Sequence, residues 1–199
     1  MKVYGLILAG GRSSRFGSDK AFAKLAGIAL VARIAQSLSA SIAALAVSGG
    51  PQAAACVHAR LLADPPGTPQ GPLAGIVAGL AWAEAEGADW LVTATCDVPL
   101  IPADMTARLI AAAESRNARL AIARTSDGPH PLCAVWRPQL RSALAAALAD
   151  GVHPPVRMFA EDMIAVEVLF APREHFFNIN TLADLETAER YLGQGRAHG

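Results

Sequence analysis

Residues 8–20 combine adjacent glycines with spaced cations, a combination suited to binding a polyphosphate. Gly10 and Gly11 let the backbone approach a ligand closely, and their N–H groups can donate to phosphate oxygens. Arg15 offers a planar fork for two parallel phosphate contacts, and Lys20 supplies a compact charge. The segment directly follows an apolar run typical of a buried strand, and open parallel sheets bind ligands beyond the carboxyl ends of their strands. The pattern therefore predicts a phosphate-binding loop.

Two common phosphate loops do not fit this segment. A Walker A loop needs Gly-Lys-Ser/Thr after four spacer residues, and the dinucleotide fingerprint needs Gly-x-Gly-x-x-Gly, whereas Gly10 and Gly11 are adjacent. A nicotinamide-dependent oxidoreductase is therefore the least favoured class of enzyme. Without Arg15 and Lys20, an ordinary loop with solvated charges would explain the glycines equally well.

Two carboxylates follow other predicted strands. Asp97 stands at the end of the apolar residues 91–96, and a carboxylate fixed there suits Mg²⁺, which takes oxygen ligands and substrate phosphates. The alternative for Asp97 is a helix-capping residue before a proline-rich turn. Asp64 precedes Pro65, Pro66 and Gly67, where an aspartate that serves only the turn is an equally good interpretation.

The elements that must position these groups alternate between short apolar runs and longer alanine-rich stretches. We expect strands at residues 3–9, 42–47, 60–63, 89–95, 120–124, 132–136 and 163–169, and helices at residues 29–39, 73–86, 102–116, 139–150 and 181–192. This rhythm predicts an α/β fold with a mostly parallel central sheet and helices on both faces. We expect one domain over residues 1–192 and a flexible tail at 193–199.

Charge and apolar content limit the classes of partner. Lys and Arg total 17 and Asp and Glu total 17, so the formal net charge is zero, which gives no general attraction to nucleic acid or to a membrane surface. No run reaches the ~18 apolar residues of a membrane span, and residues 1–9 lack the pattern of a signal peptide. The three cysteines, at 56, 96 and 133, are odd in number and widely spaced, which favours a reducing cytoplasm.

Several motifs together resemble a known family. The pattern Leu-x-Gly-Gly-x-x-x-Arg-x-Gly-x-x-Lys at residues 8–20 resembles the signature of the sugar-nucleotide and cofactor nucleotidyltransferases with a Rossmann-like fold. With Gly-Pro-Leu-Ala-Gly at 71–75, Cys-Asp-Val-Pro at 96–99, His-Pro at 130–131 and Asn-Ile-Asn-Thr at 178–181, the chain is similar to the molybdenum cofactor guanylyltransferases. The similarity extends from residue 6 to about residue 192.

This resemblance implies a three-layer α/β/α fold, Mg²⁺ as cofactor, and transfer of GMP from GTP to the terminal phosphate of molybdopterin or molybdenum cofactor, with release of pyrophosphate. It implies a nucleotide site made of Leu8, Ala9, Gly10, Gly11, Arg15, Lys20, Asp64, Gly75 and Asp97. Within that set, Arg15, Lys20 and Asp97 are the expected catalytic residues, and Asp97 is the expected metal ligand. Asn178 and Asn180 are expected against the pterin substrate, and on a strand they would share a face because they are two residues apart.

The chain departs from the family pattern at two places, and alternatives to the implied function stay open. Ser48 stands where the family often has Asn, and residues 152–155 stand where it often has Arg, with Arg157 as an expected replacement cation and His153 given no role. His130 is interpreted as structural. The same chemistry with CTP and a catalytically silent nucleotide-binding carrier of the cofactor are alternatives. Proteins of cofactor biosynthesis or molybdoenzyme maturation are expected as further partners.

Overall fold

A seven-stranded sheet runs through the part of the chain that the computed structural model describes, residues 1–10 and 20–196. Its strands are β1 (Val3–Leu8), β4 (Ala44–Ser48), β5 (Arg60–Leu62), β6 (Trp90–Thr95), β7 (Leu120–Thr125), β8 (Gly128–Trp136) and β9 (Val166–Leu169), in the order β5-β4-β1-β6-β8-β7-β9. The pairing is parallel except at β8, which is antiparallel to both β6 and β7.

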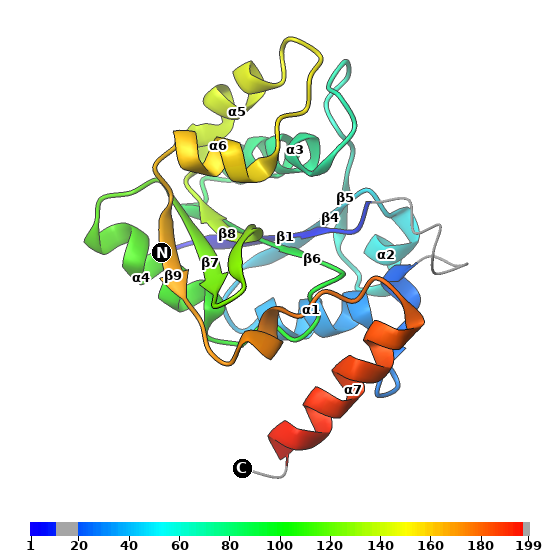
Figure 1. Cartoon of the computed structure of the whole chain (residues 1–199). Helices are drawn as coiled ribbons and strands as arrows, with labels where there is room; N and C mark the ends of the chain where they lie inside the picture. Colours follow the sequence, from blue (N-terminus) through cyan, green and yellow to red (C-terminus); the bar gives the residue numbers. More distant parts are fainter. Residues whose placement is uncertain (11–19, 197–199) are drawn as a thin grey trace.

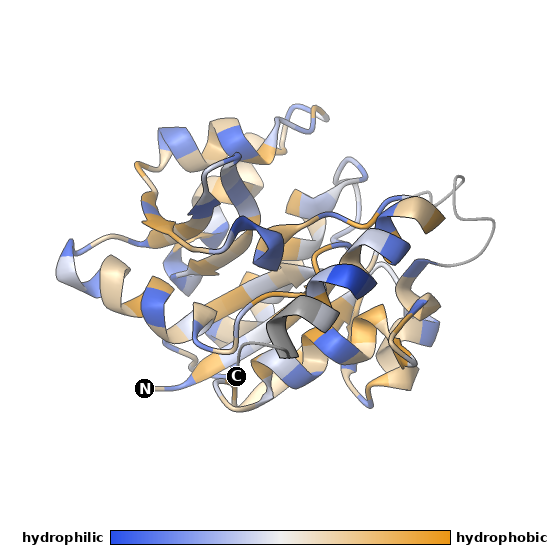
Figure 2. Cartoon of the chain, turned by 60° about the horizontal axis from the view of Figure 1, so that its bottom comes forward, coloured by the Kyte–Doolittle hydropathy of each residue, from blue (hydrophilic) through white to orange (hydrophobic). Residues whose placement is uncertain are grey.

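Helices cover both faces of this sheet (Figure 1). One face carries α1 (Leu30–Ser39), α2 (Pro51–Cys56) and α4 (Met105–Ser115), and the other carries α3 (Pro72–Ala85), α5 (Arg141–Ala147) and α6 (Val156–Asp162). Neighbouring residues of β1 point to opposite faces, so that Ile7 joins one apolar core and Leu6 joins the other. Figure 2 shows hydrophobic residues both in the strands and on the helices that cover them. The predicted three-layer, mostly parallel α/β fold is therefore confirmed.

The last helix, α7 (Leu182–Arg196), packs outside these layers. It covers a small hairpin formed by β2 (Lys24–Leu25) and β3 (Ile28–Ala29), where Leu25, Leu30, Ile179 and Ala188 form a third apolar cluster. The helix continues to Arg196, four residues beyond the expected end of the last helix at residue 192; residues 197–199 lie outside the described part.

Several boundaries differ from the sequence-based expectation. The helix expected from residue 102 begins at Met105, because the Met105 N–H bonds to the Pro102 carbonyl in a turn that precedes the helix. The helix expected at 139–150 is split into the 3₁₀ turn η2 (Pro138–Leu140) and α5. Helices α2 and α6, the β2–β3 hairpin and the 3₁₀ turns η1 (Lys20–Phe22) and η3 (Arg173–Phe176) were not expected.

The register of three neighbouring strands decides where the functional loops meet. Leu8 at the end of β1 pairs with Ser48 of β4 on one side and with Thr95 of β6 on the other. These parallel strands therefore end level with one another. The loops that follow them, which carry Gly10, Gly49 and Asp97, leave the sheet at the same edge.

Candidate active site

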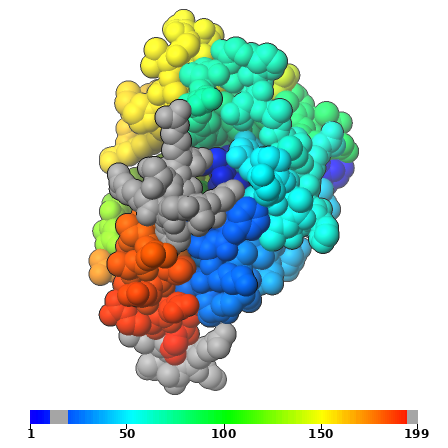
Figure 3. All heavy atoms as spheres, turned by 90° about the vertical axis from the view of Figure 1, so that its right-hand side faces the viewer, coloured from blue at the N-terminus to red at the C-terminus, as the bar shows by residue number. Residues whose placement is uncertain are grey.

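A cavity of about 650 Å³ lies at this edge of the sheet. The residues that line it come from the ends of β1, β4 and β6 and the loops after them, from the loop between β5 and α3, from the start of α3 and from β8: Leu8, Gly10, Ser48, Gly49, Asp64, Gln70, Gly71, Pro72, Thr95, Asp97 and Leu132. Figure 3 views the molecule from the right-hand side of Figure 1 and shows the orange and red α7 beside the blue residues that follow position 20. The volume is in the range of small-molecule sites.

Asp97 is held by contacts on both its side chain and its backbone. The Thr95 hydroxyl donates to Oδ1 of Asp97, and the Ile179 N–H donates to the Asp97 carbonyl at 2.8 Å. The other carboxylate oxygen, Oδ2, lies 3.6 Å from Nζ of Lys20, and the Asp97 side chain is 30% exposed. This carboxylate is therefore fixed in orientation and still open to the cavity.

Lys20 joins the two ends of the site. Its Nζ donates a 2.8 Å hydrogen bond to Oδ1 of Asn180, and its side chain is only 15% exposed. Asn180 is itself fixed, because its backbone N–H donates to Asp184 at 2.8 Å. That bond is the main cause that keeps the pKa of Asp184 below its ordinary value, with smaller contributions from Thr181 and the charge of Lys20. The Lys20 ammonium group is therefore held between Asp97 and Asn180.

Asp64 and Ser48 form a second polar pair in the cavity wall. The Ser48 side chain is buried, and its hydroxyl donates to Oδ1 of Asp64 at 3.2 Å. Ser48 therefore orients a carboxylate, in addition to lining the cavity. Next to it, Gly49 has a φ of +83°, and a Cβ there would overlap the backbone of Gly10, so the two loops approach to a distance that only glycine permits.

Three of the predicted nucleotide-binding residues in the described part, Ala9, Lys20 and Gly75, do not line the cavity. The Ala9 N–H donates to the Ser48 carbonyl at 2.9 Å, which ties the start of the first loop to β4. Gly75 is buried in the first turns of α3, and a Cβ at this position would overlap the Ser48 hydroxyl. The position of Gly75 therefore serves the close packing of α3 on β4, and its proposed contact with nucleotide stays a prediction.

Asn178 and Asn180 lie in an extended segment between η3 and α7 that is not a strand. Both are exposed and flank the buried Ile179, so they share the outward side as expected. Asn180 reaches Lys20, whereas the Asn178 amide has no partner among the described residues. Gly11 and Arg15 lie outside the described residues.

His130 and Cys133 both lie on β8, where His130 is half-buried and Cys133 is buried. The His130 ring stacks on Phe176 with centroids 4.9 Å apart, and its Nε2 is 2.9 Å from the Thr125 hydroxyl. Burial lowers the pKa of His130, opposed by the charge of Asp127. Burial also raises the pKa of the Cys133 thiol, with the nearby Asp97 charge acting in the same direction. These contacts support the structural interpretation of His130.

Arg157, the expected replacement cation, forms an ion pair within its own helix. It lies on α6, and its Nε is 2.8 Å from Oε1 of Glu161 one helical turn away, with both side chains largely exposed. The expectation that Arg157 faces the pterin substrate therefore has no support in its contacts.

Three other residues that line the cavity were not predicted as site residues: Gln70, Thr95 and Leu132. Thr95 directly precedes the motif at residues 96–99, and Leu132 directly follows the His-Pro motif, so both stood next to a recognisable signal. Gln70 stood next to no such signal. His153 was given no role, yet its ring lies directly behind Gly71, a contact that only the fold creates.

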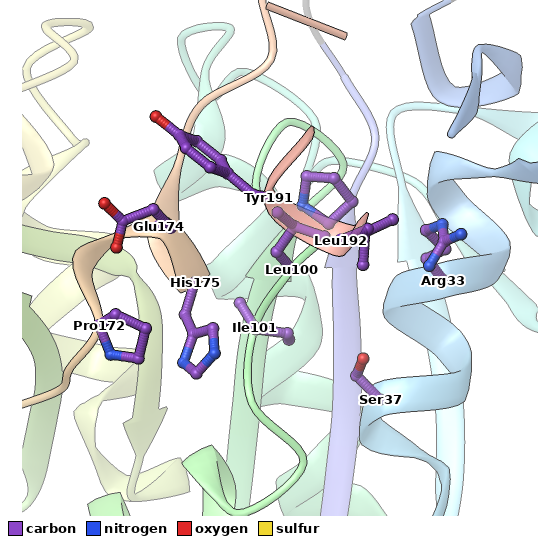
Figure 4. Close-up of a pocket in the computed structure, with 10 residues that line it drawn as sticks. Arg33, Ser37, Leu100, Ile101, Pro172, Glu174, His175, Tyr191 and Leu192 are labelled. Carbon is purple, nitrogen blue, oxygen red and sulfur yellow. The ribbon is translucent and has the colours of Figure 1, made fainter. Parts of the chain in front are cut away.

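Figure 4 shows a second cavity of about 650 Å³, on another side of the molecule. Arg33 and Ser37 of α1, Glu174 and His175 of η3, and Tyr191 and Leu192 of α7 contribute to its lining. None of the predicted site residues in the described part lines it, so it is distinct from the cavity at the strand ends.

Comparison with known proteins identifies the family. The family description "MobA-like NTP transferase domain" matches residues 5–188. The chain belongs to this family. A protein of Cereibacter sphaeroides named molybdenum cofactor guanylyltransferase is 40% identical over 195 residues, which cover 96% of this chain and 98% of that protein. A protein of the same name from Rhodopseudomonas palustris is 36% identical over 192 residues, covering 93% of this chain and 91% of that protein.

Solved structures agree with the fold of this MobA-like transferase. The crystal structure of molybdopterin-guanine dinucleotide biosynthesis protein A from Archaeoglobus fulgidus superposes with a TM-score of 0.76 at 23% identity, covering 96% of this chain and 99% of that one. A CMP:2-keto-3-deoxy-manno-octonic acid synthetase complexed with CTP superposes with a TM-score of 0.71 at 14% identity, covering 98% and 100%. The family therefore makes the chain a nucleotidyltransferase, and the solved structures show that it shares their fold.

The donor set of this MobA-like transferase fits Mg²⁺. Asp64 and Asp97 are two carboxylates that line one cavity, beside the glycine loop where phosphates are expected. Within residues 1–10 and 20–196 there is no cluster of three or more His, Cys, Asp or Glu that could hold a metal by itself. Mg²⁺ is commonly bound by one or two carboxylates plus substrate phosphates and water, so the residues present match that mode.

Among the described helices, none has the length and apolar character needed to cross a membrane.

Proposed function

We propose that this chain transfers GMP from GTP to the terminal phosphate of molybdopterin, with or without bound molybdenum, and releases pyrophosphate. The observation that carries the proposal is the meeting of Lys20, Asp97 and Asn180 at the edge of the cavity. The names of relatives with 36–40% identity supply the choice of guanine nucleotide and pterin.

The reaction needs positioning more than proton transfer. An oxygen of the pterin phosphate forms a bond to the α-phosphorus of GTP, and the bond from that phosphorus to the bridging oxygen breaks, with its electron pair leaving on pyrophosphate. The nucleophile is already an anion, so no general base is required. This agrees with a cavity in which none of the described lining residues is His or Cys. Rate acceleration then comes from alignment and from neutralisation of phosphate charge.

Lys20 is the described residue best placed to neutralise that charge. Asp97 and Asn180 hold its Nζ from two sides, so the ammonium group needs little reorganisation when a phosphate arrives. We assign Arg15, from the same loop, a parallel role on the leaving pyrophosphate.

Asp97 is the residue that would hold Mg²⁺, with Asp64 as the second carboxylate of the cavity. When bound, Mg²⁺ supplies positive charge that offsets the phosphate oxygens. The Thr95 hydroxyl keeps Asp97 oriented toward that position through its bond to Oδ1.

The two asparagines are assigned to the pterin side. Asn178 presents an amide that has no partner among the described residues, and Asn180 links the pterin side to Lys20. This arrangement would place the attacking phosphate next to the cation that stabilises the leaving group.

A single-turnover assay tests the proposal. Purified protein is mixed with molybdopterin, Mg²⁺ and either GTP or CTP, and the dinucleotide product and pyrophosphate are measured. We expect product with GTP and none with CTP. Product with CTP alone would assign the chain as a cytidylyltransferase, and tight GTP binding without pyrophosphate release would assign it as a silent carrier. The wide spacing of the three cysteines supports placing this reaction in the cytoplasm. We also propose proteins of molybdoenzyme maturation as further partners.

A further inference from the structure

The imidazole of His153 lies against the first turn of α3, although the two are 80 residues apart. Its Nε2 accepts a 3.1 Å hydrogen bond from the backbone N–H of Leu73. The first N–H groups of a helix have no partner inside the helix, and here the preceding Gly71 has no side chain to serve as a cap, while Pro72 has no N–H. His153 therefore performs the task of a cap from a distant loop.

Gly71 is fitted to the same ring. Its φ is +153°, and a Cβ at this position would overlap the Cδ2 and Nε2 atoms of His153. The ring therefore packs against the backbone of Gly71 at a distance that any side chain would prevent. The contact fixes both the position of the ring and the path of the backbone at residue 71.

The opposite side of this backbone faces the cavity. Gln70, Gly71 and Pro72 line it together with Asp64 and Asp97, whereas His153 is not among the lining residues. The wall that runs from Asp64 to α3 is thus fixed at both ends, by the Ser48 hydroxyl at Asp64 and by His153 at Leu73. The ring stands directly behind the wall.

We propose that His153 is a positioning residue for the bound nucleotide. It holds residues 70–72 in the shape that accepts a nucleoside triphosphate and does not touch the ligand itself. The inference rests on the proposed function in one respect, namely that a nucleoside triphosphate binds in this cavity. It assigns a role to the loop between α5 and α6, which brings the later half of the chain to the wall of the nucleotide cavity.

Two substitutions separate the hydrogen bond from the space that the ring fills. His153→Leu fills similar space and accepts no hydrogen bond, whereas His153→Gln offers an amide oxygen to the Leu73 N–H. Val152→Ala, at the neighbouring position with a 66% exposed side chain, is the matched control. For each protein, the Kd for Mg-GTP and for Mg-CTP is measured by calorimetry, along with KM for GTP, KM for the pterin, kcat and the unfolding midpoint.

We expect His153→Leu to weaken nucleotide binding and to raise KM for GTP by about tenfold, because the N–H of Leu73 loses its partner. KM for the pterin and kcat should stay within about twofold of the wild type, and His153→Gln and Val152→Ala should bind nucleotide like the wild type.

A His153→Leu protein that binds nucleotide as tightly as the wild type would overturn the proposal, even with a lower unfolding midpoint. If the wild type binds CTP in place of GTP and His153→Leu weakens that binding, the guanine assignment fails and the role of His153 stands. If the wild type binds neither nucleotide, both fail.

Discussion

Lys20 donates a 2.8 Å hydrogen bond to the side-chain oxygen of Asn180, 160 residues further along the chain. The same ammonium group lies 3.6 Å from Asp97. One cation is therefore oriented by the segment that follows β6 and by the segment that precedes α7. Under the proposed function, Lys20 would stand where the nucleotide side and the pterin side of the site meet.

Replacing Lys20 should damage catalysis more than folding. Lys20→Gln removes the positive charge that the structure orients at the cavity edge, and we expect kcat to fall about 10²-fold or more. Lys24→Gln, an exposed lysine of β2, is the control and should leave kcat unchanged. Steady-state kinetics with GTP and molybdopterin measure both, and a Lys20→Gln enzyme with wild-type kcat would remove Lys20 from the catalytic set.

The two asparagines should differ in which kinetic constant they affect. Asn180→Ala releases Lys20, so kcat should fall about tenfold or more along with pterin binding. Asn178→Ala removes an amide that holds no other described residue, so KM for the pterin should rise with little change in kcat. Initial rates over a range of pterin concentrations separate the constants; equal effects of the two changes on kcat would contradict the assignment.

Asp97 should be required for metal-dependent turnover. Asp97→Asn keeps the shape of the side chain and its neighbours but removes the charge, and we expect turnover to fall at least about 10²-fold at saturating Mg²⁺. Asp104→Asn, an exposed position before α4, is the charge-matched control. Activity is titrated against Mg²⁺ for both variants, and near-normal turnover in Asp97→Asn would exclude it as the metal ligand.

Gly75→Ala tests the close packing of α3 on β4. The new methyl group would overlap the Ser48 hydroxyl, so we expect the free energy of unfolding to fall by about 1–3 kcal/mol. Gly193→Ala, also within a helix but with open space around it, should leave stability unchanged or raise it by up to about 1 kcal/mol. Urea unfolding measures both, and equal stability of the two variants would show that α3 shifts to accept the methyl group.

His130 should make the protein less stable in mild acid. Burial lowers its pKa in the folded chain below the ordinary value of 6.5, so the unfolded chain takes up the proton first as the pH falls. The stability that depends on a neutral ring is thus present above that value and decreases as the pH falls through 6.5 toward the folded pKa. Between about pH 7.5 and pH 5.5 the unfolding free energy of His130→Gln should therefore fall less than that of the wild type. His58→Gln, an exposed histidine, should behave like the wild type.

Much of the sheet was predictable because its central strands are buried on both faces. The runs at β1 and β6 are mostly apolar and contain no charged residue, and that pattern needs no knowledge of the fold. The short elements were missed because α2 has six residues and each strand of the β2–β3 hairpin has two, too few for a periodic pattern. Pro51 at the start of α2 was an available signal.

The site was predictable where its residues follow strands. Gly10 and Asp97 come directly after β1 and β6, and parallel pairing alone brings them together. The contacts of Lys20 with Asn180 and of His153 with Leu73 depend on how distant loops return to the cavity, which no local pattern encodes. Arg157, expected as a replacement cation, pairs with Glu161 in the same helix, and its predicted contact with the pterin phosphate stays a prediction.

The hydrogen bond from the Ile179 N–H to the Asp97 carbonyl has a consequence for how the protein is made. Synthesis proceeds from the N-terminus, so the glycine loop, Lys20 and Asp97 leave the ribosome well before the segment that contains Ile179 and Asn180. Until that segment emerges, the ammonium group has no asparagine to orient it and the Asp97 loop lacks its backbone partner. The nascent chain can therefore form its central strands early, but it becomes competent for transfer only after nearly all of the sequence has been translated.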